Sequence, residues 1–319
     1  MTSSSKIRAW LQKPIPFGLT GQGLRGHLPS ALPFIEQGKL TLSIEGSVLK
    51  VMSYTGKKVT GWVNFPFSPA LVNRGFIADE GAVARVIQNA IANRGLKGSK
   101  VVAALPGVDS ISRVISLPYG KDVDPEIAIP REVRRLTAVS LEENYLYWQA
   151  LPQEEGSFFT LAVPKFAVDS LVRTLRMAGL KPVSFDTAPL ALARAIDQSP
   201  AIIAHVELNS LDVIIIGENA PAVMRSHFSE ESLSGDDADW VAGEIERTMS
   251  FYNTSRREPL PPEVPVYLSG SLSSNQEVAR AVEEATGHSV YEAEPAMKLP
   301  EDFPKASMMV NIGLTMKSS

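Results

Sequence analysis

The sequence contains no cysteine, no long apolar run and no large excess of charge of either sign. Without cysteine, the chain has no disulfide framework, no thiolate nucleophile and no cysteine-ligated metal. No segment approaches the roughly 18 apolar residues of a transmembrane helix, and the N-terminus lacks the apolar core of a signal peptide, so we expect a cytoplasmic protein. The net charge of −4 gives no bulk electrostatic affinity for nucleic acid.

Motifs for catalysis and for metal binding are also scarce. The sequence has neither the G-x-S-x-G pattern of a nucleophile elbow nor a P-loop. Its four histidines never fall at a metal-ligand spacing; they are His27, His205, His227 and His288. No metal site and no obvious catalytic acid or base therefore follow from the sequence.

What is present is the pattern of a large α/β protein. With 319 residues and 44% hydrophobic residues, the chain is long enough for two lobes. Apolar periodicity predicts a helix over 77–94, with Asp79 as N-cap and Gly95 as C-cap. A second helix is predicted over 165–179, with a set of apolar side chains facing inward: Phe166, Leu171, Val172 and Leu175. Strands alternate with these helices, which favours an α/β fold with antiparallel meanders and parallel crossovers.

Two stretches of the sequence follow one pattern of strand, tight turn, strand, turn and strand. They span residues 40–62 and 202–226, and both consist of short β-branched runs separated by Gly, Asn and Ser. Glu45 and Ser47 fall in the same register as Glu207 and Asn209. The repeat predicts a duplicated subdomain, with a cleft between the first turns of the two halves.

Three small polar turns, each directly after a predicted buried strand, are the candidate ligand-binding elements. They are residues 45–47, 207–210 and 269–271. The backbone N–H groups of such turns can hold phosphate oxygens, and Lys50 could add a cation. Turns of this kind also serve as plain connectors in any α/β protein, and on the chemistry alone that interpretation is favoured.

The first 38 residues form a polar leader rich in proline and glycine. Ile7, Trp10 and Leu11 lie at helical spacing beside basic residues, which is compatible with a short helix that docks on a membrane or a partner. The composition favours a flexible tail.

The order of these elements resembles the PilM family of type IV pilus assembly proteins, which are actin-like relatives of the division protein FtsA. The likeness covers about residues 40–317. Its most specific parts are the segment AGLKPVSFDTAPLALAR within 166–196 and the helix EIERTMSFY at 244–252. Further segments that match in order are VVAALPG, VYLSG and MMVNIGLTMK.

The resemblance implies an α/β, actin-like (ribonuclease H-like duplicated) two-lobe fold with an inserted small α+β subdomain. The expected divisions are a leader over 1–38, a first lobe over 39–107 and an inserted subdomain over 108–180. The chain then returns to the first lobe over 181–200 and forms the second lobe over 201–306. A C-terminal helix and tail occupy 307–319.

The resemblance also implies a location and partners. Members of the family lie on the cytoplasmic side of the inner membrane and bind the N-terminal tail of a membrane-spanning partner, PilN. The expected role is therefore a scaffold of type IV pilus assembly, or of related secretion or competence machinery, that holds a PilN-like tail in a groove on the first lobe. The pilus motor ATPase is a second candidate partner, and homo-oligomerisation is left open.

The family binds Mg–ATP between the lobes, and the family pattern would place nucleotide contacts on seven residues here: Gly46, Ser47, Lys50, Glu207, Asn209, Gly270 and Ser271. Several positions depart from that pattern. Ser43 replaces an acid that helps to hold Mg²⁺, and Glu45 and Asn209 replace glycines. Two carboxylates, Glu45 and Glu207, would repel a triphosphate unless a cation lies between them.

The sequence thus predicts a degenerate site with weak Mg–ATP binding at most and no hydrolysis. The alternative function is an active ATPase or phosphotransferase of the same superfamily. A divergent FtsA-like division protein is a third hypothesis, disfavoured because the final residues, KSS, form no amphipathic membrane helix.

Overall fold

The computed structural model describes residues 38–317, except 57, 118–123, 152–153, 218–219 and 256–257. The predicted leader, with its apolar positions Ile7, Trp10 and Leu11, lies outside the described residues apart from Gly38. Within the described part of the chain, no helix has both the length and the apolar content needed to cross a bilayer.

The first lobe is built on one five-stranded sheet. Its strands are β1 (Lys39–Glu45), β2 (Val48–Thr55), β3 (Lys58–Pro66), β6 (Lys100–Leu105) and β10 (Lys181–Thr187). β1, β2 and β3 form the predicted antiparallel meander, and β6 and β10 continue the sheet in parallel on the other side of β1. Every residue of β1 from Leu40 to Ser43 is buried, because helices cover both faces of the sheet.

The second lobe repeats this design strand for strand. Its strands are β11 (Ala201–Val206), β12 (Ser210–Ile216), β13 (Pro221–Phe228), β14 (Val266–Ser269) and β15 (Val290–Glu292). The order β13-β12-β11-β14-β15 matches the order β3-β2-β1-β6-β10 of the first lobe, with the same parallel and antiparallel pairings. Even the irregularity in the second hairpin recurs, after Ser53 in one lobe and after Ile215 in the other. The predicted duplication is confirmed.

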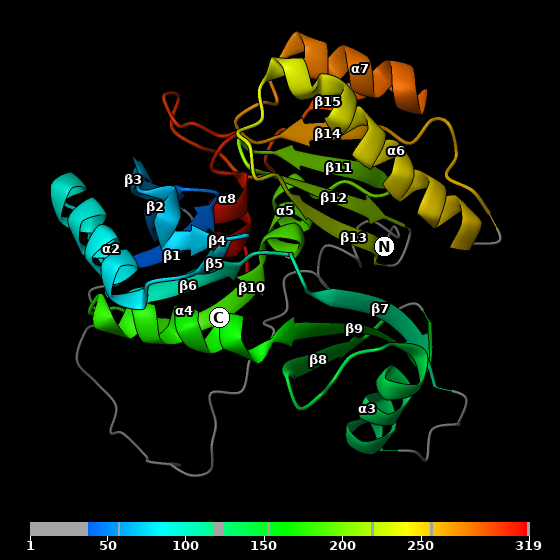
Figure 1. Cartoon of the computed structure of the whole chain (residues 1–319), viewed down its shortest axis with the longest axis horizontal. Coiled ribbons are helices and arrows are strands. Elements are labelled where there is room, and N and C mark those ends of the chain that lie inside the picture. The colour runs from blue at the N-terminus through cyan, green and yellow to red at the C-terminus, as the bar shows by residue number, and fades with distance from the viewer. Residues whose placement is uncertain are drawn as a thin grey trace.

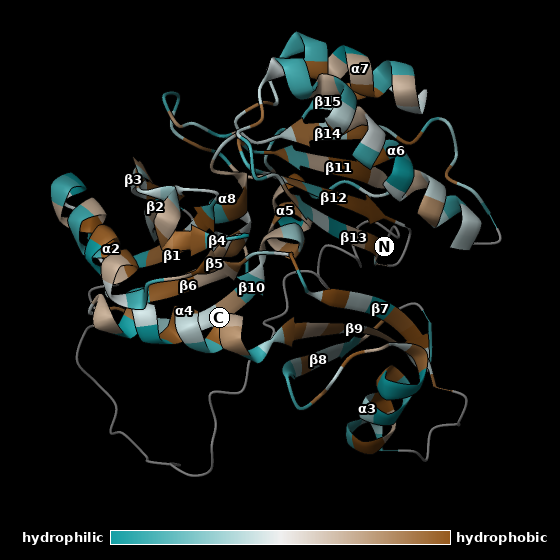
Figure 2. Ribbon diagram, viewed as in Figure 1, coloured by the Kyte–Doolittle hydropathy of each residue, from teal (hydrophilic) through white to brown (hydrophobic). Residues whose placement is uncertain are grey.

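Helices complete each lobe. α2 (Glu80–Arg94) has both predicted caps but begins at residue 80 and not at 77. The Asp79 side chain accepts a hydrogen bond from the Ala82 N–H, and Gly95 is left-handed with φ of +60°. α6 (Ala238–Ser255) and α7 (Gln276–Thr286) pack on the second sheet around a core of their own. Figure 2 shows hydrophobic residues along the strands of both sheets, whereas hydrophilic residues alternate with hydrophobic ones along α2, α6 and α7.

Two helices lie between the lobes and join them (Figure 1). α5 (Ala188–Ile196) leads from the first lobe into the second, and α8 (Met309–Thr315) returns to contact β1, β2 and β6. They cross so closely that a Cβ on Gly313 would lie 1.9 Å from the Ala191 carbonyl oxygen, which restricts this position to glycine. One hydrophobic core runs from the first sheet through both helices to Ile203, Ile214 and Ile216 of the second lobe.

A small α+β unit is inserted after β6. Its sheet, in the order β7-β9-β8, consists of β7 (Ile111–Ser116), β8 (Asn144–Ala150) and β9 (Ser157–Pro164), and α3 (Pro125–Leu136) covers it. The next helix, α4 (Lys165–Met177), belongs to the predicted 108–180 segment but packs against α2, β6 and β10. α4 therefore connects the inserted sheet to the first lobe.

The inward orientation predicted for Phe166 is wrong. Leu171, Val172 and Leu175 are buried as predicted, but Phe166 is 56% exposed. At about 100° per residue, position 166 lies about 140° around the helix from Leu171, so it falls outside the buried stripe. The ring instead packs edge-to-face on Phe76 of the short hairpin β4 (Val72–Asn73) to β5 (Phe76–Ile77), with centroids 4.9 Å apart.

Candidate functional site

The three polar turns singled out in the sequence meet between the lobes. The turn between β1 and β2 supplies Glu45 and Gly46, the turn after β11 supplies Glu207 and Asn209, and the turn after β14 supplies Ser271. They converge because the two lobes have the same topology and face each other with the same strand ends. The predicted convergence of these turns is therefore observed, but charged side chains fill the space between them.

Lys50 lies at the centre of this space. It projects from β2 directly opposite Ser43 of β1, on the same face of the hairpin as Glu45. Its Nζ donates to Glu45 Oε2 at 2.7 Å and to Glu207 Oε1 at 2.8 Å. The third bond of the ammonium group goes to the Ser307 carbonyl oxygen at 2.7 Å, so all three of its hydrogens are used.

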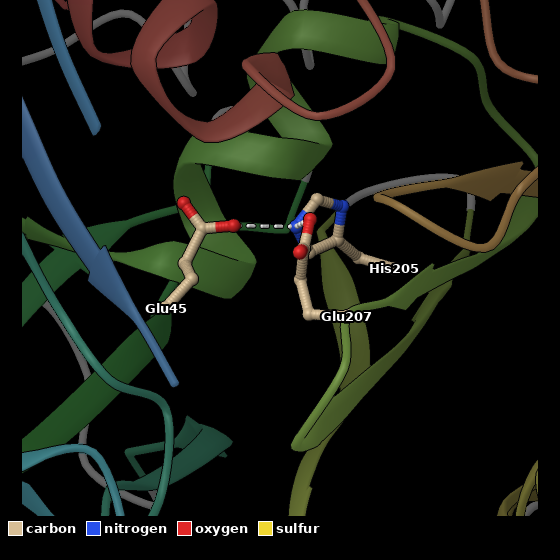
Figure 3. A group of neighbouring side chains, drawn as sticks. All are labelled: Glu45, His205 and Glu207. Carbon is tan, nitrogen blue, oxygen red and sulfur yellow. Dashed lines mark hydrogen bonds and ion pairs between the residues drawn. The ribbon is translucent and has the colours of Figure 1, made fainter. Parts of the chain in front are cut away.

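His205 is a second basic side chain beside the same two carboxylates. Its Nε2 lies 2.9 Å from Glu45 Oε2 and 3.4 Å from Glu207 Oε1 (Figure 3). Its Nδ1 lies 2.8 Å from Ser269 Oγ. The register of the sheet explains the last contact, since His205 and Ser269 are partners in the parallel pair β11–β14.

We call these four side chains, Glu45, Lys50, His205 and Glu207, the interlobe ion cluster. The exposure of each side chain is 7% or less. Burial by itself would raise the pKa of Glu45, but Lys50 and His205 lower it to about 2. Burial likewise disfavours the charged forms of Lys50 and His205, yet the neighbouring carboxylates raise the pKa of both groups. The contacts within the cluster therefore favour the charged forms of Glu45, Lys50 and His205.

Residues near the C-terminus close the cluster on one side. Asn311 of α8 is fully buried; its amide donates to Thr41 Oγ1 and to the Lys50 carbonyl, and its Oδ1 accepts from Ser43 Oγ at 3.0 Å. Ser43 also lies 2.5 Å from Glu45 Oε1. Ser43 stands where the family pattern has an acid. The carboxylate of Glu45, two residues along the same face of β1, is thus held beside that position.

The two turns expected to hold phosphate touch each other. Gly46 has φ of +58°, and a Cβ built there would lie 3.2 Å from Asn209 Oδ1, so the Asn209 side chain lies directly against the glycine. Asn209 Nδ2 donates to the Glu231 carbonyl, and the Ser47 carbonyl accepts from the Phe67 N–H. The side chain at position 209 therefore occupies space that a glycine would leave open.

The third turn directs its donors to protein rather than to open space. Ser271 donates its N–H to Glu207 Oε1 at 3.1 Å and its hydroxyl to Glu207 Oε2 at 2.5 Å. The N–H of Gly270 donates to the Ala306 carbonyl. Both backbone donors are consequently used within the chain.

A recess adjoins the first turn and is small. Its lining includes Gly46, Gly107, Ser210 and Asp212, and its free volume is about 30 Å³. That is enough for about two water molecules, whereas bound small molecules of nucleotide size need several hundred Å³. Burial raises the pKa of Asp212 in this recess to about 6.

Glu45, His205 and Glu207 also form a group with the spacing of metal ligands, since one ligand atom from each lies within 4.8 Å of the others. The Lys50 ammonium, however, contacts both carboxylates at hydrogen-bond distance. The position between the carboxylates is therefore taken by a cation of the protein itself, and the residues do not fit a bound metal ion.

Sequence reasoning missed His205 and the double role of Lys50. It placed Glu45 and Glu207 near one pocket and counted one available cation, Lys50. The structure uses that one cation for both carboxylates and supplies His205 as the second. A signal was present, because His205 precedes Glu207 by two residues and so emerges from the same face of the strand end.

No family model matches the chain, and no curated protein matches it in sequence. Solved structures do match. A chain of the PilM–PilN type IV pilus biogenesis complex aligns over 89% of this chain and 98% of its own length, with a TM-score of 0.72 and 21% identity. The cytoplasmic domain of EpsL, an inner-membrane component of the Vibrio cholerae type II secretion system, aligns over 88% and 96%, with a TM-score of 0.53 and 11% identity.

A third structure identifies the fold by its description. A Bacteroides thetaiotaomicron protein with an actin-like ATPase fold and unknown function aligns over 90% of this chain and 99% of its own, with a TM-score of 0.51 and 11% identity. The present chain therefore has the actin-like two-lobe fold predicted from its sequence, and its resemblance to PilM is confirmed at the level of the fold.

Proposed function

We propose that this protein is an actin-like scaffold of a type IV pilus or related secretion machine, located at the cytoplasmic face of the inner membrane. In this role it binds the cytoplasmic tail of a PilN-like membrane protein. The observation that carries the proposal is the likeness to a chain of the PilM–PilN complex over nearly the whole length of both chains. The likeness to cytoplasmic EpsL, from a different secretion machine, supports the wider class.

The first lobe has a small apolar recess, with a free volume of about 20 Å³, beside which we propose that such a tail binds. It lies between the end of β6, the β4–β5 hairpin and α4, and the residues that line it are mostly apolar: Ile44, Phe76, Ile77, Leu105, Ala167 and Leu171 among them. Phe166 and Phe76 form their edge-to-face pair beside it. An exposed aromatic side chain next to an apolar recess is suited to anchor an extended, partly apolar peptide.

Replacing Phe166 by alanine is expected to weaken binding of this tail about tenfold. An aromatic anchor at the centre of an interface contributes more than about 1 kcal/mol, and about 1.4 kcal/mol corresponds to a factor of ten. The measurement is fluorescence anisotropy with a labelled peptide from the N-terminal cytoplasmic tail of a PilN-like membrane protein.

Phe251→Ala is the matched control for this experiment. Phe251 is also an exposed phenylalanine on a helix, 46% exposed on α6, but it lies on the second lobe. The control should bind the peptide as the unaltered protein does. No binding to the unaltered protein at high micromolar concentration would refute the proposed partner, and equal losses in both variants would refute the proposed groove.

We also propose that the interlobe site is a degenerate nucleotide site. Its carboxylates face one another across Lys50, its third turn donates to Glu207, and Asn209 lies against Gly46. Millimolar Mg–ATP is therefore expected to change the melting temperature very little. Ligand at a concentration near its Kd stabilises by only about 0.4 kcal/mol.

The test is a thermal shift and calorimetry series with Mg–ATP and Mg–ADP. A micromolar Kd would contradict the degenerate site. Steady ATP turnover that disappears in Glu207→Ala would establish the alternative, an active ATPase of the same fold.

A further inference from the structure

The interlobe ion cluster joins parts of the chain that are far apart in sequence. Glu45 and Lys50 belong to the first lobe, and His205 and Glu207 belong to the second. Two close contacts join the lobes: Lys50 to Glu207 at 2.8 Å and His205 to Glu45 at 2.9 Å. Each lobe therefore presents one carboxylate and one cation to the other.

The charges in the cluster are balanced and their hydrogen bonds are satisfied. Lys50 uses three acceptors and His205 has a partner at each ring nitrogen. Moving the lobes apart would break the Lys50–Glu207 and His205–Glu45 contacts and leave each lobe with one pair, Lys50–Glu45 at 2.7 Å or the longer His205–Glu207 at 3.4 Å. Breaking contacts of buried charged groups is unfavourable. The arrangement favours closed lobes over open ones.

The cluster also lies between the two turns that the sequence marks as candidate phosphate-binding elements, the turns after the first strand of each lobe. Here these turns touch through Gly46 and Asn209, and a protein ammonium lies between the two carboxylates.

We propose that the interlobe ion cluster holds the two lobes closed in the absence of any nucleotide, so that the shape of the protein does not depend on ATP. The inference rests on the proposed function only in taking this cleft to be the degenerate nucleotide site. Its consequence is that the recess on the first lobe is presented to a partner continuously and is not switched by nucleotide.

The test measures the distance between the lobes. Because the sequence has no cysteine, spin labels attach only where cysteines are introduced. Asn89→Cys on α2 and Ala285→Cys on α7 place labels at exposed positions of the first and second lobes. Pulsed electron paramagnetic resonance should give one narrow distance distribution, unchanged by millimolar Mg–ATP.

In this labelled pair, Lys50→Met should broaden the distribution and add a population at longer distance. Glu207→Gln, which keeps the size and shape of the side chain, carries the same expectation should Lys50→Met not fold. The matched control is Lys317→Met, which removes a second buried lysine that contacts Asp186 and the Phe185 carbonyl, outside the cluster. Its distribution should remain narrow.

A narrow, unshifted distance distribution in both Lys50→Met and Glu207→Gln would overturn the proposal. A change in the distance distribution of the otherwise unaltered protein on adding Mg–ATP would also overturn it. The peptide measurement with Phe166→Ala decides the scaffold function separately. If the unaltered protein does not bind the peptide but the spin-label distances are as expected, the closed-lobe inference stands without the scaffold function. If the peptide binds but the spin-label distances are not as expected, the scaffold function stands without the closed-lobe inference.

Discussion

Replacing Lys50 by methionine is expected to lower the free energy of unfolding by about 3–5 kcal/mol, the range found when one partner of a buried ion pair is removed. Methionine keeps much of the length of the side chain but leaves Glu45 and Glu207 without the ammonium between them. The raised pKa of Lys50 shows that its partners more than compensate for its burial. Urea denaturation at neutral pH, with the slope compared between variants, measures the change.

The contrasting variant is Lys317→Met. Burial lowers the pKa of Lys317 to about 8, only partly offset by Asp186, which Arg194 already contacts at 2.7 Å. The charge of Lys317 is therefore unfavourable in the folded protein, and its removal should be neutral or stabilising. Of the two buried lysines, only Lys50 is thus expected to lower the free energy of unfolding when it is replaced.

A double-variant cycle checks that the effect belongs to the cluster. Lys50→Met combined with Glu207→Gln should be less destabilising than the sum of the two single changes, because both act on the same contact. Strict additivity, or a loss below about 1 kcal/mol for Lys50→Met, would contradict the assigned role of Lys50.

The second large effect is expected in acid. The pKa of Glu45 is lowered to about 2, so its contribution to stability is complete above its ordinary value of 4.5 and is lost as the pH falls from there towards 2. That interval corresponds to about 3 kcal/mol. Denaturant titrations at successive pH values should show a steep decline below pH 4.5, and Glu45→Gln should remove most of it.

Asp212 is expected to change the stability in the opposite direction to Glu45 as the pH falls. Its pKa is raised to about 6 from an ordinary value of 3.8, so it opposes folding at neutral pH and stability should increase as the pH falls from 6 to 3.8. Asp212→Asn should therefore stabilise the protein at pH 7 and flatten the profile between pH 4 and 6. A decline that begins above pH 5, or one that persists unchanged in Glu45→Gln, would show that other groups control the acid transition.

Much of the fold could be predicted because it depends on local sequence. Asp79 and Gly95 mark the ends of α2 through their own backbone preferences, and the repeated meander pattern fixes the shared strand order of the two lobes. The position of the polar turns follows from that repeat. Predicting these features requires only residues that are neighbours in the sequence or in the register of one sheet.

The contents of the site could not be predicted in the same way. Lys50 and Glu207 are 157 positions apart, and whether Lys50 contacts a ligand or both carboxylates depends on how closely the lobes approach. Phe166 was misplaced for a related reason, since the inward face of α4 is set by its neighbours α2 and β6 and not by hydrophobicity alone. The role of His205 in β11 could not be predicted either, because Glu45, which lies 2.9 Å from it, belongs to the other lobe.

The return of α8 to the first sheet has a consequence for the order in which the protein is made. Asn311 hydrogen bonds to Thr41 and Ser43, about 270 residues earlier in the chain, and Lys50 donates to Ser307. During synthesis, β1 and β2 therefore lack these buried polar partners until residues 307–311 have been added. The first lobe can begin to fold early, but its interior is completed only once α8 has been made.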